Sequence, residues 1–240
     1  MCTFKSAIIT KSGDVLHSPF TDSHEDLVRL FKLNDSADVR GEPRFARVEF
    51  RPEFRKDSAD ISKYSLLIDA ARTPDWFDSA MHASVVSRLS LIIKDMIITG
   101  DVDLLVGGKY ILAVGAHVSC VKNCSIEAML GNSKVGEMRG SSNVGIMLGN
   151  SNVGEMRESS KVGVMREGSK VGVMRGSSKV GVMWGSSNVG VMLGNSNVGE
   201  MWGSSNVGEM RESSKVGVMR EGSKVNENSP ETQTKAKANP

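Results

Sequence analysis

The sequence predicts an α+β N-terminal domain followed by an all-β solenoid (a β-helix) of nonapeptide repeats. The first observation is internal repetition, because ten units of nine residues follow one another without a gap over residues 133–222. Each unit reads S-[NK]-V-G-x-M-x-[GE]-[SNG], so fixed apolar positions recur beside variable polar ones. The second observation is that residues 1–110 lack this period and contain strand-like and helix-like segments instead. A short fixed period is typical of solenoid architectures.

The N-terminal domain, residues 1–110, is expected to contain an antiparallel sheet and two helices in the order β-β-α-β-β-α. Ser23 can cap the first helix, which is expected to end near Asn34. The second helix is expected to start at Thr73 and run to about Thr99, because a hydroxyl, a proline and a carboxylate follow one another at its start. Alternating or β-branched runs predict strands at residues 3–10, 15–16, 45–50 and 64–68.

In the solenoid, residues 133–225, the fixed columns of the repeat predict which side chains point inward. The third column is valine and the sixth is methionine in all ten units, which predicts stacked ladders in a narrow core. Glycine in the fourth column indicates a bend or a positive φ, and serine in the first can bond to backbone at a corner. Nine residues are too few to encircle a core, so two repeats per coil are expected. Residues 151–171 recur at 205–225, an offset of 54, or three such coils.

Stacking alternate units would produce two faces of different chemistry. One face gathers charged side chains: Glu137, Glu155, Glu209, Arg139, Arg157, Arg175 and Arg211. The other gathers the aliphatic Ile146, Val164, Val182 and Val218 beside the larger Leu148, Arg166, Trp184, Trp202 and Arg220. The second face is the more apolar, so its five larger side chains are the candidate interaction surface.

Two flanking segments complete the predicted organisation. Residues 111–132 are expected to form a transition or capping coil, because Cys124 to Asn132 already match part of the repeat. Residues 226–240 contain no aliphatic side chain larger than alanine and are expected to be disordered. No secretory leader or membrane-spanning apolar run is recognised, and three cysteines suit a reducing compartment. A cytoplasmic location, in a bacterial or phage-infected cell, is therefore expected.

Cys2 and Asp22 are the candidate catalytic residues. Removal of Met1 would expose Cys2 as an N-terminal nucleophile whose own α-amine can act as the base. The opening Met-Cys-Thr, a strand, a Ser-Gly-Asp turn and Asp22 resemble the start of the bile salt hydrolases and penicillin V acylases. The resemblance implies amide hydrolysis by Cys2 with help from Asp22, over about 22 residues, although the arginine of that motif is absent. The alternative is a cysteine without a catalytic role at the start of a strand.

His117, Cys120 and Cys124 are the candidate metal ligands, with the spacing H-x2-C-x3-C. They supply three soft ligands where structural zinc normally takes four, so the alternative is a capping coil with inward cysteines. No cofactor is expected. Calcium is excluded for the repeat because it contains no aspartate, and the absence of threonine argues against ice binding.

The layout of a small α+β head followed by S-[NK]-V-G-x-M units resembles uncharacterised bacterial and bacteriophage proteins with nonapeptide solenoid tails. The expected function is a non-enzymatic structural or protein-interaction role, with a protein partner or self-association through the solenoid and no membrane contact. One alternative is an enzyme or ligand-binding head with the solenoid as spacer or oligomerisation element. A second alternative is weak nucleic-acid binding through the lysines along the repeat, although the net charge of +2 does not favour it.

Overall fold

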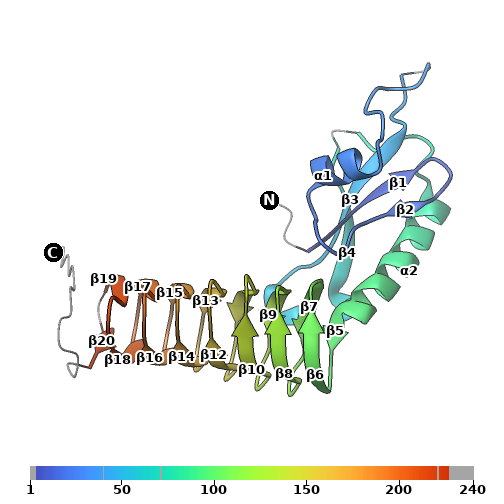
Figure 1. Cartoon of the computed structure of the whole chain (residues 1–240). Helices are drawn as coiled ribbons and strands as arrows, with labels where there is room; N and C mark the ends of the chain where they lie inside the picture. Colours follow the sequence, from blue (N-terminus) through green and yellow to red (C-terminus); the bar gives the residue numbers. More distant parts are fainter. Residues whose placement is uncertain (1–3, 40, 71, 221, 227–240) are drawn as a thin grey trace. The chain divides into compact units, whose positions relative to one another are not determined.

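A computed structural model describes residues 4–39, 41–70, 72–220 and 222–226 of the chain. The chain divides into two compact units, Met1–Met96 and Ile97–Pro240. Figure 1 shows strands and helices in the first unit and a stack of parallel strands in the second. The predicted fold class, an α+β part followed by a β-solenoid, is confirmed. The tail that was predicted to be disordered lies outside the described residues from position 227 onward.

The first unit is built on a four-stranded antiparallel sheet with the strand order β2-β1-β3-β4. Its strands are β1 (Lys5–Thr10), β2 (Val15–Leu16), β3 (Phe45–Pro52) and β4 (Tyr64–Ile68). Its helices are α1 (His24–Leu30) and α2 (Ser79–Met96), with the short 3-10 helices η1 (Arg55–Asp57) and η2 (Ile61–Lys63) before β4. The predicted cap of α1 is confirmed, because the Ser23 hydroxyl accepts the Asp26 N–H at 3.3 Å.

The centre of this unit's core is β1. Successive side chains of a strand point to opposite faces, and Ile8 and Ile9 are both fully buried, so both faces of the sheet are covered. Ile8 packs with Leu27 of α1 and Phe45 of β3. The other helix, α2, contacts β1, β2 and β4. It buries one stripe of side chains four residues apart, Val85, Leu89 and Ile93.

The predicted start of α2 at Thr73 was wrong. Pro74 instead begins a single turn, which is closed by a hydrogen bond of 2.9 Å from the Phe77 N–H to the Pro74 carbonyl. Asp78 then caps the helix, since its carboxylate accepts the backbone N–H three residues later at 2.8 Å. The sequence therefore carries two helix-start signals close together, and the second one, Asp78 before Ser79, is used.

The second unit consists of two parallel eight-stranded sheets. The odd sheet contains β5 (Ile97–Ile98), β7 (Lys109–Leu112), β9 (Ser125–Met129), β11 (Asn143–Met147), β13 (Lys161–Met165), β15 (Lys179–Met183), β17 (Asn197–Met201) and β19 (Lys215–Met219). The even sheet contains β6 (Asp101–Val106), β8 (His117–Lys122), β10 (Lys134–Arg139), β12 (Asn152–Met156), β14 (Lys170–Met174), β16 (Asn188–Met192), β18 (Asn206–Met210) and β20 (Lys224–Val225). The chain alternates between the two sheets, one strand at a time.

The register of the strands confirms two repeats per coil. Val144 pairs with Val162 and Met147 pairs with Met165, so each residue lies beside its equivalent 18 positions later. The same offset holds in the even sheet, where Met156 pairs with Met174. One coil therefore contains one strand from each sheet and two corners.

The solenoid begins at Ile97, directly after α2 ends at Met96, and thus earlier than the expected boundary at residue 110. In β6, Val102 and Leu105 pair with Val118 and Val121 of β8, which in turn pair with the third and sixth columns of the first repeat. The first coils therefore have the geometry of the repeat without its sequence signature.

The predicted Val and Met ladders form the core of the solenoid. Third-column side chains over Val135–Val207 and sixth-column side chains over Met138–Met210 are at most 3% exposed. The first-column serines lie beside this core at the corners. The hydroxyls of Ser142, Ser214 and Ser223 donate to the carbonyl oxygen three residues earlier, at 2.6, 2.8 and 2.5 Å. Within the described residues the predicted corner bond is made only there, because the other first-column hydroxyls are buried and have no hydrogen-bond partner: Ser133, Ser151, Ser160, Ser169, Ser178, Ser187, Ser196 and Ser205.

The fourth-column glycine is required by the close approach of neighbouring coils. A Cβ atom added at Gly154 would lie 2.5 Å from the carbonyl oxygen of Gly136, one coil earlier. A Cβ atom added at Gly172 would lie equally close to the carbonyl oxygen of Gly154. The positive φ that was considered for this column is wrong, because no described fourth-column glycine has one. This column needs glycine for space.

Positive φ values occur in the eighth column, at the corners. The described glycines of this column have φ between 63° and 68°, and the glutamates that replace glycine there, Glu158, Glu167 and Glu212, have φ between 56° and 58°. This region is unfavourable for residues with a Cβ atom. Asn123 takes the same place in the coil before the repeats, with φ 53°. The eighth column is therefore the left-handed position of every corner from Asn123 to Glu212.

We expect Glu158→Gly to stabilise the solenoid by about 0.5–1 kcal/mol, because glycine enters the left-handed region without the cost that a Cβ atom imposes. The midpoint of thermal unfolding, followed by circular dichroism, measures the effect. Glu212→Gly is the matched control, since the Glu212 carboxylate accepts the Gly194 N–H at 2.7 Å and its removal offsets the gain. A lower midpoint for Glu158→Gly would contradict the expectation.

Candidate functional site

The candidate site is the outward face of the odd sheet from β11 to β19. It includes the residue that follows each of these strands, and we name this surface the odd face. The five predicted interaction residues form one row on it, because each donates its N–H to the carbonyl of the methionine one coil earlier: Leu148, Arg166, Trp184, Trp202 and Arg220. The fifth-column side chains lie beside this row: Val164, Val182, Glu200 and Val218, which are partly exposed, and Ile146, which is buried. The repeat thus places all five predicted interaction residues on one face.

Two stacked tryptophans dominate the odd face. The rings of Trp184 and Trp202 are 4.8 Å apart between centroids and inclined by 12°. The guanidinium carbon of Arg220 lies 4.2 Å from the centroid of the Trp202 ring. Since Trp184 and Arg220 are one coil on either side of Trp202, both faces of that ring are covered. Trp184 remains 40% exposed, and stacking and cation–π contact stabilise the row.

The charges of the odd face are not balanced. It carries five cations, Lys161, Arg166, Lys179, Lys215 and Arg220, and one carboxylate, Glu200. The Glu200 carboxylate is already engaged, because it accepts the indole N–H of Trp202 at 2.9 Å. The odd face is therefore cationic, with an aromatic and aliphatic strip through it.

The even sheet carries a paired charge ladder instead. Glu137 lies between Arg139, at 2.6 Å, and Arg157, at 2.5 Å. Glu155 lies in the same way between Arg157, at 2.9 Å, and Arg175, at 2.5 Å. Burial alone would raise the pKa of Glu155, but the hydrogen bonds from the two arginines outweigh it and lower this pKa below its usual value. Each arginine of this ladder is neutralised by a neighbour.

We expect Glu155→Gln to destabilise the protein at neutral pH by less than about 1 kcal/mol, because the ladder is partly exposed to solvent. A carboxyl group with a lowered pKa in the folded state stabilises it above the pKa of the unfolded chain. That contribution disappears as the pH falls through the lowered value. Thermal midpoints of the two proteins should therefore converge in acid and in high salt. Glu167→Gln, which alters an exposed corner carboxylate, should show no such convergence; equal pH profiles would contradict the expectation.

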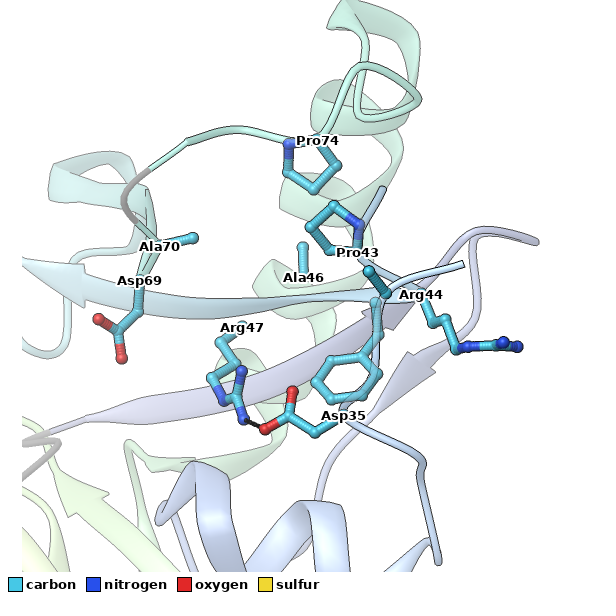
Figure 2. Close-up of a pocket in the computed structure, with 10 residues that line it drawn as sticks. Asp35, Pro43, Arg44, Ala46, Arg47, Asp69, Ala70 and Pro74 are labelled. Carbon is cyan, nitrogen blue, oxygen red and sulfur yellow. Dashed lines mark hydrogen bonds and ion pairs between the residues drawn. The ribbon is translucent and has the colours of Figure 1, made fainter. Parts of the chain in front are cut away.

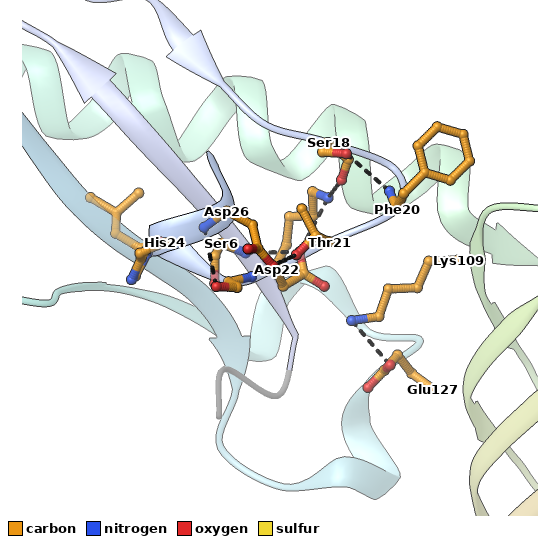
Figure 3. Close-up of polar contacts among 12 residues, drawn as sticks. Ser6, Ser18, Phe20, Thr21, Asp22, His24, Asp26, Lys109 and Glu127 are labelled. Carbon is orange, nitrogen blue, oxygen red and sulfur yellow. Dashed lines mark hydrogen bonds and ion pairs between the residues drawn. The ribbon is translucent and has the colours of Figure 1, made fainter. Parts of the chain in front are cut away.

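The candidate catalytic pair is only partly described. Cys2 lies outside the described residues. Asp22 is 9% exposed, and its Oδ1 lies 3.2 Å from the Lys5 ammonium and accepts the Ser6 N–H at 3.2 Å. Figure 3 shows Ser6 beside Asp22 in this cluster. Burial and the Lys5 charge lower the pKa of the nearby His17. These contacts tie the segment before α1 to β1, and the catalytic role of Cys2 and Asp22 stays a prediction.

The first unit contains a pocket of about 200 Å³. Figure 2 shows residues that line it, from the segment before β3, from β3 itself and from the segment after β4: Asp35, Pro43, Arg44, Ala46, Arg47, Asp69, Ala70 and Pro74. Arg47 pairs with Asp35 at 2.6 Å, and Asp69 lies 3.1 Å from the buried His24. Asp35 and Arg47 therefore neutralise each other and Asp69 is engaged by His24, which favours a structural role for these three side chains.

The three candidate metal ligands are not brought together. His117 and Cys120 occupy the second and fifth columns of β8, on the outward side, whereas Cys124 is buried at a first-column corner. The Cys124 thiol donates to the Leu105 carbonyl at 3.1 Å, and burial raises its pKa. Among the described residues, no group of three or more His, Cys, Asp or Glu side chains could hold a metal ion. Cys124 is inward, as the capping-coil alternative expects, whereas Cys120 is not.

No family model, curated protein or solved structure matches this chain. The chemistry of its own residues is therefore the basis for a function. In the part of the chain that the structure describes, neither helix has the length and apolarity that a membrane crossing requires.

The repeat pattern predicted the row on the odd face, but the imbalance of charge on that face was not predicted. The signal was present, since an 18-residue coil places Lys161 beside Lys179 without an acidic residue between them. The ring geometry of Trp184 and Trp202 was not predictable, because a repeat fixes the spacing of side chains and not their rotamers.

Proposed function

We propose that this protein has a non-enzymatic interaction role, in which the solenoid is a rigid scaffold and the odd face is the contact surface for a protein. The observation that supports this most directly is the row of Trp184, Trp202 and Arg220 on a regular sheet, since exposed tryptophan and arginine are enriched in protein interfaces. The scaffold role is supported by the continuous ladders of the core, which hold the row in place.

The near-identity of the repeats supports this function as well. Residues 151–171 and 205–225 are identical, which is expected after tandem copying. Copying in whole coils lengthens a face without changing its chemistry, as suits a bacterial or phage protein whose partner is large or repetitive. A heterologous protein is the proposed partner, and self-association through the same face is the alternative outcome of the test.

Site-specific photo-crosslinking tests the proposal in cells that make the protein. A photoreactive amino acid replaces Val182 on the odd face or, as the matched control, Val191 in the same column of the even sheet. A discrete crosslinked protein is expected from position 182 and not from position 191. A crosslink to a second copy of the chain would assign the face to self-association, and equal or absent crosslinks at both positions would refute the proposal.

A shortened chain tests the scaffold role. Deleting residues 151–204 joins Asn150 to Ser205 in register, because the sequence after Ser205 repeats the sequence after Ser151. Three coils, about 14 Å of solenoid, and both tryptophans of the face are lost. The far-ultraviolet circular dichroism per residue should remain strand-like, while a crosslink placed at Val218 should weaken. An undiminished crosslink would show that the tryptophans and the length are dispensable.

A further inference from the structure

Lys161 and Lys179 place like charges side by side on the odd face. They are register partners on β13 and β15, which are adjacent strands, and both side chains are exposed. In the part of the chain that the structure describes, neither ammonium forms an ion pair with a carboxylate. Like charges directly opposite each other on a sheet are unfavourable. The even sheet avoids this arrangement, since Lys170 lies between Asn152 and Asn188.

Arg166 adds a third cation to the same two coils. It follows β13, is exposed, and forms no ion pair with any described carboxylate. The arginines of the even sheet are arranged differently, because Arg139, Arg157, Arg175 and Arg211 each lie within 2.9 Å of a glutamate oxygen. The cluster of Lys161, Arg166 and Lys179 thus has the electrostatic character of a site for negative charge that the chain itself does not supply.

An apolar strip runs through this cationic cluster. Val164 and Val182 are register partners on the same two strands and are partly exposed. Trp184 follows β15 and is 40% exposed. Cationic side chains therefore lie at both margins of the strip, with lysines at the second column and Arg166 at the seventh. A ligand on this surface would meet apolar and cationic groups alternately.

The ring geometry distinguishes between two kinds of anionic ligand. Single-stranded nucleic acids bind by stacking bases on exposed aromatic ring faces along a basic groove. Trp184 and Arg220 cover both ring faces of Trp202, and Trp202 covers one face of Trp184, so the stack leaves a single ring face for a base beside its ring edges and the neighbouring aliphatic side chains. Aliphatic side chains of a peptide fit such a surface better than bases do.

We infer that the odd face binds an acidic, aliphatic protein segment, whose carboxylates pair with Lys161, Lys179 and Arg166 and whose aliphatic side chains contact Val164, Val182 and Trp184. This inference rests on the proposed interaction role and adds the chemistry of the partner. Burying unpaired cations against carboxylates removes their mutual repulsion, and the apolar strip supplies contact area that a simple polyanion cannot use.

Titration of the full-length protein with three probes tests the inference. The probes are a twelve-residue peptide of alternating Glu and Val, one of alternating Glu and Ser with the same charge, and a twelve-nucleotide oligothymidylate. Tryptophan fluorescence and calorimetry measure the affinities. The Glu-Val peptide is expected to bind at least tenfold more tightly than either other probe, with affinity that falls as salt rises. Tighter binding of the oligonucleotide would assign the face to nucleic acid, and equal binding of the two peptides or no binding of the Glu-Val peptide would overturn the inference.

Paired lysine variants locate the binding. The double variant Lys161→Gln with Lys179→Gln should lower the affinity for the Glu-Val peptide at least tenfold. The matched control, Lys134→Gln with Lys170→Gln, removes the same charge from the second column of the even sheet and should change the affinity less than twofold. Equal losses in the two variants would show non-specific attraction and overturn the inference. If crosslinking at Val182 captures a protein without acidic segments, the proposed function stands and only the inference fails.

Discussion

Gly172→Ala is expected to cause a large loss of stability for the addition of a single methyl group, about 3 kcal/mol. The new Cβ atom would lie 2.5 Å from the carbonyl oxygen of Gly154. Both sides of this contact are backbone in paired strands, so no flexible side chain can move to relieve it. The pairing of β12 with β14 must open locally, in the middle of the solenoid. Thermal unfolding followed by circular dichroism measures the loss.

Gly100→Ala is the control for the general effect of alanine in place of glycine. Gly100 lies between β5 and β6 of the same unit and has no positive φ. Apart from its chain neighbours, no atom lies within 4 Å of the position that the added methyl group would take. Its replacement should change stability by less than about 0.5 kcal/mol. If Gly172→Ala unfolds at the same temperature as Gly100→Ala, the spacing between coils is not what excludes a side chain from the fourth column.

The period of the repeat is what made the solenoid predictable. Invariant valine and methionine, three positions apart within nine, predicted two inward ladders, and both are buried as expected. The same reasoning predicted two repeats per coil, because nine residues cannot surround a core. The start of the solenoid was predicted wrongly, because the period is absent from its first coils. The coils formed by β5 to β8 use Val102 and Leu105 in the ladder positions, so the solenoid extends to Ile97 without any repeat that a reader could recognise.

Glycine illustrates a second limit of sequence reasoning. The repeat has glycine in the fourth column and mostly glycine in the eighth, and either could have marked a left-handed residue. The eighth column has the positive φ, even where glutamate occupies it at Glu158, Glu167 and Glu212. The fourth column has none and excludes side chains through contact between coils. Contacts between residues 18 positions apart cannot be read from the pattern of one unit.

The sequence predicted which residues make up the candidate site, but it did not predict which of their charges are paired. Stacking alternate units placed Trp184, Trp202 and Arg220 in one row, as the structure has them. Which cations are neutralised depends on the side chains one coil away, and these differ between the sheets. On the even sheet each arginine meets a glutamate, whereas Lys161 meets Lys179 on the odd sheet. The strand register decides which side chains lie beside one another, so units of similar sequence form two faces whose charges are paired differently.

Met174→Ala is expected to destabilise the solenoid by about 2–3 kcal/mol, because the side chain is fully buried between Met156 and Met192 of the neighbouring coils. The loss should fall in the lower part of the range for buried methionine, since the flexible methionines above and below can fill part of the cavity. Val173→Ala, at an outward and partly exposed position of the same strand, should cost less than about 1 kcal/mol. Thermal and urea unfolding measure both.

The position of the lost side chain along the solenoid decides how unfolding proceeds. Each coil contacts only its neighbours, so stability is approximately a sum of coil and interface terms. A weakened central coil at Met174 should separate the solenoid into two halves and broaden the unfolding transition. Met219→Ala in β19 removes a side chain that is already partly exposed, and it should cost less and leave the transition sharp. Equal losses at the two positions would show that the solenoid unfolds as one cooperative block and not coil by coil.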